Sequence, residues 1–403
     1  MKIISFYINN YRSLVDFKIT DFDDTTIFYG ENNAGKSNVL SALSIIFQRK
    51  KKRTSEEKQN FYEGIIEGFS NNFFGNKTNE IDFMVELEVN RDELDLVELL
   101  QKEIKLLNTN TFTIFGKIEK ASRDLADIST EQIMLNRKII YKGGKTFDYF
   151  PMIKKKSIEQ GYLSESFSKL IYPLNDCITT ISSYRDMHKA RFTENIANDI
   201  EPSAFKNFMH SLYLSEENHS IFENINQVLR REPFNFGEIS FSRENGLLEL
   251  MIKENNTRLP IKHLGSGVLQ TLYIIASIVY SKHKIICIEE LEQNLSPRRQ
   301  NFILRKLQSL INDEEIGDLQ QIILSSHSPV FSSNKLGLIY YLDKKDGKTI
   351  ISEMKPKAAD IKKYPGLKGY FRPTVHGKDT YSAKEMDERV KENIELGNQL
   401  LKR

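Results

Sequence analysis

Hydrophobic and polar residues alternate along this chain with two periods, one typical of strands and one typical of helices. Short β-branched and aromatic runs predict strands at 2–8, 25–29 and 81–89. The second of these runs ends abruptly at Gly30, and apolar residues then recur on one face from Lys36 to Phe47. The N-terminal region therefore predicts a strand, a glycine turn and a helix in direct succession.

The second half of the chain predicts more strands and helices of the same kinds. Strands are predicted at 238–241, 247–252, 284–288 and 321–324. Helices are predicted at 205–214, 221–231, 266–279 and after Pro297, a residue that suits a first helical turn. The segment 284–288 is almost continuously apolar, as is typical of a buried parallel strand. These patterns predict an α/β protein.

The pattern changes between residues 93 and 234. Leu94–Leu107 is a candidate amphipathic helix, but no heptad repeat continues through this range, which argues against a long coiled coil. We interpret 93–234 as a compact insertion that contains helices and serves dimerisation or partner binding. It would separate an N-terminal lobe (1–92) from a C-terminal lobe (235–355), followed by a tail (356–403) with a charged helix at Ala383–Leu401.

Composition excludes several classes of protein. The 57 basic and 55 acidic side chains nearly cancel, so a nucleic-acid surface would have to be a local patch. Arg49–Arg53 and Lys154–Lys156 are candidate contacts to double-stranded DNA, and a solvated loop is the alternative for both. Cys177 and Cys287 have neither the number nor the spacing for a disulfide framework or a zinc site. With no signal peptide and no membrane segment, we expect a soluble cytoplasmic protein.

The segment from Gly30 to Ser37 fits the phosphate-loop pattern G-x-x-x-x-G-K-[ST] in the strand–loop–helix context that it requires. Glycines let backbone N–H groups approach phosphate oxygens, and the helix N-terminus adds partial positive charge. Lys36 would reach the β- and γ-phosphates of ATP, and the Ser37 hydroxyl would bind Mg²⁺. The predicted nucleotide-binding residues of this loop are Gly30, Asn32, Asn33, Ala34, Gly35, Lys36, Ser37 and Asn38.

Two acidic residues, Glu289 and Glu290, follow the predicted buried strand at 284–288. Parallel sheets bind ligands at the carboxyl ends of their strands. Glu289 is therefore a candidate Mg²⁺ ligand, directly or through water, and Glu290 is a candidate catalytic residue that orients the attacking water. The alternative is a pair of solvated acids at the start of a loop, which a complete phosphate loop elsewhere in the chain disfavours.

Two further elements are candidate phosphate receptors. Gly265, Ser266 and Gly267 open an apolar helix, and a helix N-terminus with a free hydroxyl can bind an anion. Because the chain has one Walker-type lysine, we predict that this second receptor contacts the nucleotide of a partner subunit; a plain helix-opening turn is the alternative. His327 directly follows the strand at 321–324, where it can hydrogen-bond a γ-phosphate, although a lone histidine is often structural.

These elements, in this order, resemble the SMC/RecF/OLD group of ABC-type ATPases. Segment 30–37 resembles the Walker A motif of this group, and segment 285–290 resembles its Walker B motif. Segment 264–267 resembles the signature motif, and segment 291–297 resembles the D-loop. Segment 325–329 resembles the loop that carries the switch histidine, and the turn at 9–14 is similar to the group's N-terminal turn. The resemblance implies an ABC-type P-loop ATPase head, with a mixed sheet and flanking helices, that uses ATP and Mg²⁺. Leu291 and Ser296 depart from the proline and histidine common in OLD-like D-loops.

The resemblance also suggests a function. OLD nucleases carry a Toprim domain, for which the roughly sixty residues after the histidine loop are too few. We therefore expect a homodimeric or larger ATPase switch that controls a separate nuclease or toxin in bacterial anti-phage defence, as in the ATPase subunits of Septu or PARIS. The alternatives are a DNA-repair ATPase similar to RecF and a nucleotide-binding scaffold that does not hydrolyse.

Overall fold

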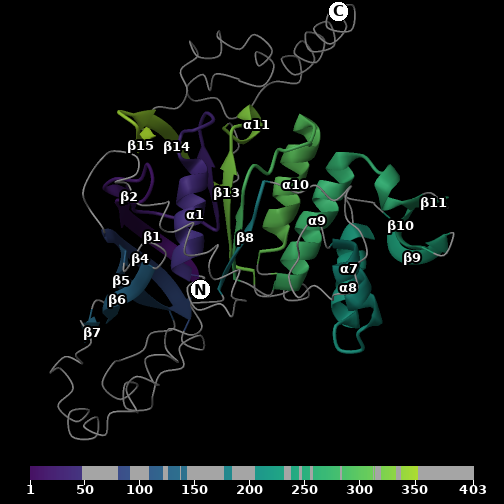
Figure 1. Cartoon of the computed structure of the whole chain (residues 1–403), viewed down its shortest axis with the longest axis horizontal. Coiled ribbons are helices and arrows are strands. Elements are labelled where there is room, and N and C mark those ends of the chain that lie inside the picture. The colour runs from purple at the N-terminus through teal and green to yellow at the C-terminus, as the bar shows by residue number, and fades with distance from the viewer. Residues whose placement is uncertain are drawn as a thin grey trace, which may run out of the picture.

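The computed structural model contains three β-sheets with helices packed between and around them (Figure 1). It describes residues 1–47, 80–90, 109–120, 126–136, 138–142, 177–183, 205–230, 237–244, 247–254, 257–281, 284–311, 313, 319–332 and 337–352. None of the helices in these ranges is long and apolar enough to cross a membrane.

The central sheet has the strand order β15-β14-β3-β13-β12-β8. All neighbouring pairs are parallel except β14 with β15, which form an antiparallel hairpin at one edge. The strands are β3 (Thr25–Tyr29), β8 (Ile178–Ile181), β12 (Ile285–Ile288), β13 (Gln321–Ser326), β14 (Leu338–Lys345) and β15 (Lys348–Ser352). The predicted mixed sheet with flanking helices is confirmed.

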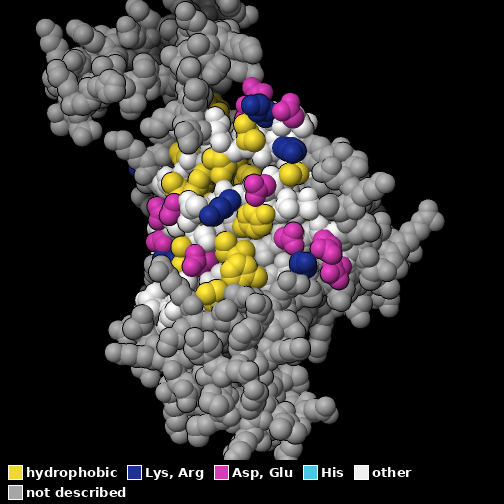
Figure 2. Space-filling view, turned by 90° about the vertical axis from the view of Figure 1, so that its left-hand side faces the viewer, with side chains coloured by type: hydrophobic (Ala, Val, Ile, Leu, Met, Phe, Trp, Pro, Cys, Tyr) yellow, Lys and Arg dark blue, Asp and Glu magenta, His cyan; other side chains and the backbone are white. Residues whose placement is uncertain are grey.

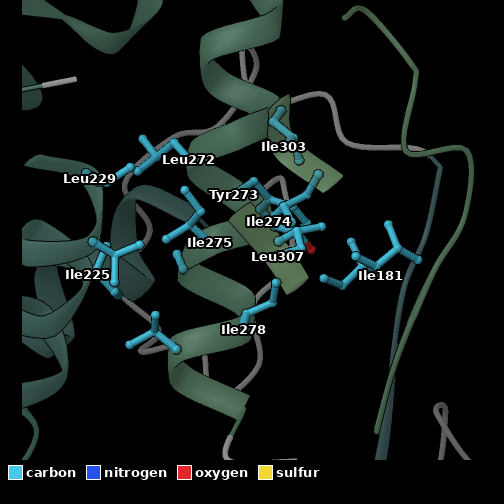
Figure 3. Close-up of a cluster of buried hydrophobic side chains, with 14 of the residues drawn as sticks. Ile181, Ile225, Leu229, Leu272, Tyr273, Ile274, Ile275, Ile278, Ile303 and Leu307 are labelled. Atoms are coloured by element: carbon cyan, nitrogen blue, oxygen red, sulfur yellow. The ribbon is translucent and has the colours of Figure 1, made fainter. Parts of the chain in front are cut away.

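The two faces of the central sheet are covered by different helices. Successive side chains of β12 point to opposite faces, so Cys287 joins the core around α1 (Lys36–Phe47) while Ile286 and Ile288 join the core on the other side. The second core contains α9 (Ser266–Ser281) and α10 (Pro297–Ser309). Figure 3 shows α9 in this core, with Ile275 and Ile278 among its buried side chains. The Walker A helix and the signature helix thus lie on opposite faces.

An antiparallel sheet, in the order β2-β1-β4-β5-β6-β7, packs on the α1 side of the molecule. Its strands are β1 (Lys2–Asn9), β2 (Phe17–Ile19), β4 (Glu80–Asn90), β5 (Thr109–Lys120), β6 (Ala126–Leu135) and β7 (Lys138–Lys142). The buried Gln321 amide of β13 joins the two sheets, because it bonds both the N–H and the C=O of Ile3 at 2.9 Å. On the face shown in Figure 2, hydrophobic, basic and acidic side chains are mixed, without one continuous basic patch among the described residues.

A third, smaller sheet lies at the opposite end, in the order β11-β10-β9. It consists of β9 (Glu238–Glu244), β10 (Leu247–Glu254) and β11 (Thr257–Pro260), which leads through the short helix η3 (Ile261–His263) into α9. Helices α7 (Phe205–Leu214) and α8 (His219–Arg230) pack beside α9 and share its core. The short helix α11 (Pro329–Ser332) follows β13.

The range 93–234 differs from the compact insertion that the sequence predicts. The predicted helices α7 and α8 are present, but β5 pairs with β4 along eleven residues and extends the N-terminal sheet, while β8 pairs with the Walker B strand β12. The described strands of this range thus complete the sheets of the head. The domain boundaries themselves stay a prediction. The expected helices at 94–107 and 383–401, both basic runs and the tail lie outside the described residues.

Candidate functional site

The phosphate loop connects β3 to α1 at the carboxyl end of the central sheet. Its first glycine is fixed by the neighbouring strands: Gly30 N–H donates to Ser326 O at 3.2 Å, and a Cβ at this position would collide with the carbonyl oxygen of Leu342. Gly35 has a φ of +99°, and a Cβ there would overlap the Thr349 hydroxyl. Both glycines are therefore required by the backbone and its close neighbours.

Lys36 is buried within this loop, with 5% of its surface exposed. Its ammonium donates to the carbonyl oxygens of Gly30 and Glu31, each at 2.8 Å. Burial lowers the pKa of Lys36, whereas the negative charges of Glu290, Glu292 and Glu31 act in the opposite direction. A buried ammonium at the N-terminus of a helix is suited to receive a polyanion.

The loop is clamped by residues from both ends of the described chain. The Thr349 hydroxyl of β15 lies 2.7 Å from Ser13 Oγ and donates to Ala34 O at 3.1 Å. Thr349 N–H also donates to Ser13 O at 2.8 Å. Ser13 belongs to the N-terminal turn, where Tyr11 and Leu14 exchange two backbone hydrogen bonds. The hairpin β14–β15 and this turn together hold the loop against α1.

The remaining predicted loop residues differ in exposure. Asn32 and Ser37 are exposed, and Ala34 is buried. Asn33 has a φ of 70°, and its side-chain oxygen accepts from Lys344 of β14 at 3.0 Å. The Asn38 amide instead contacts the N-terminal turn, where it donates to Ser13 Oγ at 2.7 Å. The predicted role of Asn38 would therefore have to use its backbone, while Asn32 and Ser37 remain accessible to a ligand.

The two predicted acids leave β12 in different directions. Glu289 Oε2 accepts from Ser183 N–H, next to β8, at 3.4 Å. Glu290 has a φ of 45°, its N–H donates to Ser325 Oγ at 3.2 Å, and its charge acts on Lys36. The structure thus brings Glu290 close to the phosphate loop, on the side where Lys36 ends, and places Glu289 beside β8.

The loop after β13 is tied to the D-loop that follows Glu290. His327 N–H donates to Glu292 Oε1 at 2.7 Å, and the His327 Nδ1 atom lies 3.0 Å from the same oxygen. A second connection runs through Ser328, whose hydroxyl donates to Gln300 Oε1 at 2.5 Å, and Gln300 Nε2 donates to Leu295 O at 2.8 Å. The His327 side chain is itself 46% exposed, so it remains accessible to a ligand.

The predicted second receptor is at the N-terminus of α9. Gly265 and Ser266 are exposed, and a Cβ on Gly265 would meet nothing within 4 Å. Gly267 is buried, since its Cβ would lie 2.9 Å from Asn294 O of the D-loop. Because α9 and α1 cover opposite faces of the central sheet, this surface is open to another molecule.

This chemistry fits a nucleoside triphosphate with a divalent cation. The phosphate loop supplies a buried cation and a twelve-residue helix that begins at Lys36, Ser37 offers an exposed hydroxyl, and Glu290 offers a carboxylate. Bound Mg²⁺ would screen the phosphate charges. Among the described residues no group of three or more His, Cys, Asp or Glu side chains that could hold a metal ion is found.

Two family models match the chain in adjacent segments. Residues 1–168 match an "AAA ATPase domain", and residues 165–333 match an "AAA domain, putative AbiEii toxin, Type IV TA system". The first match contains the phosphate loop, and the second contains strands β12 and β13. Both models describe AAA domains and together span residues 1–333, which supports an SMC/RecF/OLD-like ATPase.

Curated relatives of this ATPase include proteins with three different names. This chain is 24% identical over 357 residues to an "ATP/GTP phosphatase" of Helicobacter pylori, and the match covers 82% of this chain and 86% of the relative. It is 25% identical over 390 residues to the endonuclease GajA of Bacillus cereus, covering 81% of this chain but 55% of the endonuclease. A 117-residue segment is 27% identical to the DNA replication and repair protein RecF of Ruminiclostridium cellulolyticum, covering 28% of this chain and 31% of RecF. The family models and the first relative support nucleotide hydrolysis.

Among solved structures, the ATPase is similar to SMC heads. The head domain from Thermotoga maritima covers 88% of this chain and 99% of its own, with 13% identity and a TM-score of 0.45. An SMC head bound to the C-terminal winged-helix domain of ScpA covers 89% and 100%, with 14% identity and a TM-score of 0.49. The assignment of the fold rests on the strand order and the family models given above.

Sequence reasoning missed three residues that shape the site. Thr349 and Lys344 contact the phosphate loop from a hairpin more than three hundred residues away, and no local motif identifies them. Glu292 stands in the predicted D-loop, but the sequence analysis gave it no role. The signal that could have identified Glu292 is that it is a third acid, two positions after Glu290.

Proposed function

We propose that this protein is a Mg²⁺-dependent ATPase whose nucleotide site is completed when two copies meet. Lys36 would bind the β- and γ-phosphates of ATP, Ser37 and Glu289 would hold the cation, and Glu290 would orient the attacking water. Bound Mg²⁺ would neutralise charge on the phosphates. The contacts of Lys36 support this assignment, because its buried ammonium is held inside the phosphate loop by the carbonyl oxygens of Gly30 and Glu31 at 2.8 Å.

The composite site is supported by the exposure of Gly265 and Ser266. Their helix lies on the face of the sheet opposite to α1, and the space around Gly265 is empty. A helix N-terminus with an exposed hydroxyl can bind the γ-phosphate held by a second copy. Isologous contact of two heads would then bury two nucleotides between them.

We further propose that head closure controls a separate effector, a nuclease or toxin, in anti-phage defence. The match to GajA supports this role, and it spans about half of that endonuclease's length. The segment similar to RecF favours a second candidate, a DNA-repair ATPase that binds duplex DNA. Replacing Arg49–Arg53 with glutamine tests the DNA contact of this second candidate: duplex binding should weaken and its salt dependence should flatten, and unchanged binding would exclude this segment as the contact.

The ATPase proposal is tested with Glu290→Gln. The variant should lose turnover and accumulate a dimer in ATP and Mg²⁺, measured by phosphate release and by light scattering after size exclusion. Glu217→Gln, in the exposed turn between α7 and α8, is the matched control and should behave as the wild type. A non-hydrolysing scaffold would instead show no turnover in the wild type and no effect of Glu290→Gln.

A further inference from the structure

Glu292 is buried in a way that folding alone does not explain. Its side chain is 6% exposed, yet Oε2 has no hydrogen-bond partner among the described residues. A buried carboxylate with an unpaired oxygen reduces the stability of the folded chain, and an apolar residue of similar size would avoid that cost. An acid at this position therefore calls for a functional reason.

The partners of Oε1 point to that reason. The oxygen accepts from His327 N–H at 2.7 Å and lies 3.0 Å from His327 Nδ1. A carboxylate oxygen at this distance favours the tautomer in which Nδ1 carries the proton. The imidazole then has its other nitrogen, Nε2, available on a side chain that is 46% exposed.

Glu292 also lies near the phosphate loop. Its negative charge acts on buried Lys36 and on Tyr29 at the end of β3. It belongs to the D-loop, which packs against Gly267 of the signature helix through Asn294. A single carboxylate thus contacts the histidine loop from the segment that follows β12 and packs against the N-terminus of α9.

We propose that Glu292 is a positioning residue that holds the His327 ring through Nδ1 and leaves Nε2 for the γ-phosphate or the attacking water. This inference rests on the proposed ATPase function, and it adds a residue to which neither the sequence motifs nor the comparisons assign a role. Its contribution acts through His327, so it depends on the presence of that imidazole.

The kinetic test compares Glu292→Met, which removes both acceptors, with Glu292→Gln, which keeps one. Glu292→Met should lower kcat about tenfold with KM within about twofold, and Glu292→Gln should recover most of the rate. In a His327→Ala background, Glu292→Met should change kcat less than about twofold. Glu249→Met is the control for the loss of a carboxylate. It removes a partly buried acid of β10 whose Oε2 atom lies 3.2 Å from Lys206 Nζ on α7. Equal losses in both backgrounds would overturn the proposal.

A second readout does not depend on turnover. In protein labelled with ¹⁵N-histidine, with the His327 signal assigned from its loss in His327→Ala, the neutral ring of the wild type should carry its proton on Nδ1. Glu292→Met should shift the proton toward Nε2, and an unchanged tautomer would refute the pairing. If the wild type shows this tautomer but hydrolyses no ATP, the ATPase proposal fails while the pairing stands.

Discussion

Thr349→Val tests how the phosphate loop is held in shape. Valine matches threonine in size but lacks the hydroxyl, which lies 2.7 Å from Ser13 Oγ and 3.1 Å from Ala34 O. Ser13 keeps its bond from Asn38 at 2.7 Å, whereas Ala34 O loses the Thr349 donor. Two lost hydrogen bonds, which leave the buried Ser13 hydroxyl donor and the Ala34 carbonyl without these partners, should lower the free energy of unfolding by about 3 kcal/mol.

Thr349→Ser is the matched control because it keeps the hydroxyl and removes one methyl group, at a cost of about 1 kcal/mol. Urea unfolding followed by circular dichroism should therefore rank wild type above the serine variant and the serine variant above the valine variant, with unchanged m-values. MgATP affinity should fall in the same order. The Kd should rise about tenfold for each 1.4 kcal/mol that is needed to bring the loop back to its binding conformation. A valine variant as stable as the serine variant, with wild-type affinity, would refute this reasoning.

Four further outcomes follow from the structure. Lys36→Met should abolish the rise in melting temperature that MgATP causes. Burial lowers the pKa of Lys36, so at alkaline pH the unfolded chain holds more protons than the folded chain. The free energy of unfolding should therefore rise as the pH increases toward the pKa of Lys36 in the unfolded chain. Lys36→Met should reduce that rise. Gly35→Ala should prevent nucleotide binding, measured by calorimetry, because its φ is +99° and its Cβ would overlap Thr349. Cys287 should resist iodoacetamide until the protein unfolds, because complete burial raises the pKa of its thiol.

Local sequence patterns were sufficient to predict the central elements. The strand β3, the glycine turn and α1 lie where the 25–47 pattern places them, since these elements are set by neighbouring residues. The apolar run 284–288 predicted the buried parallel strand β12, and all four of its residues from Ile285 to Ile288 are buried. The order of motifs along the chain then predicted the class of the fold, which the strand order confirms.

Pairing between distant segments could not be predicted in the same way. β8 has four residues, too few to show a period, and it forms an edge of the central sheet only because β12 pairs with it. The hairpin β14–β15 was not predicted either, although Lys344 and Thr349 on it contact the phosphate loop. Such contacts arise from the sheet order, which a single sequence does not encode locally.

The composite site is tested most directly by mixing two variants that should each be inactive. Lys36→Ala removes the phosphate-binding lysine, and Ser266→Arg blocks the second receptor. In a mixed dimer, one site combines the intact Lys36 of one copy with the intact Ser266 of the other, so an equal mixture should regain about a quarter of the wild-type ATPase rate. A mixture with no more activity than its two components would contradict a nucleotide site shared between copies.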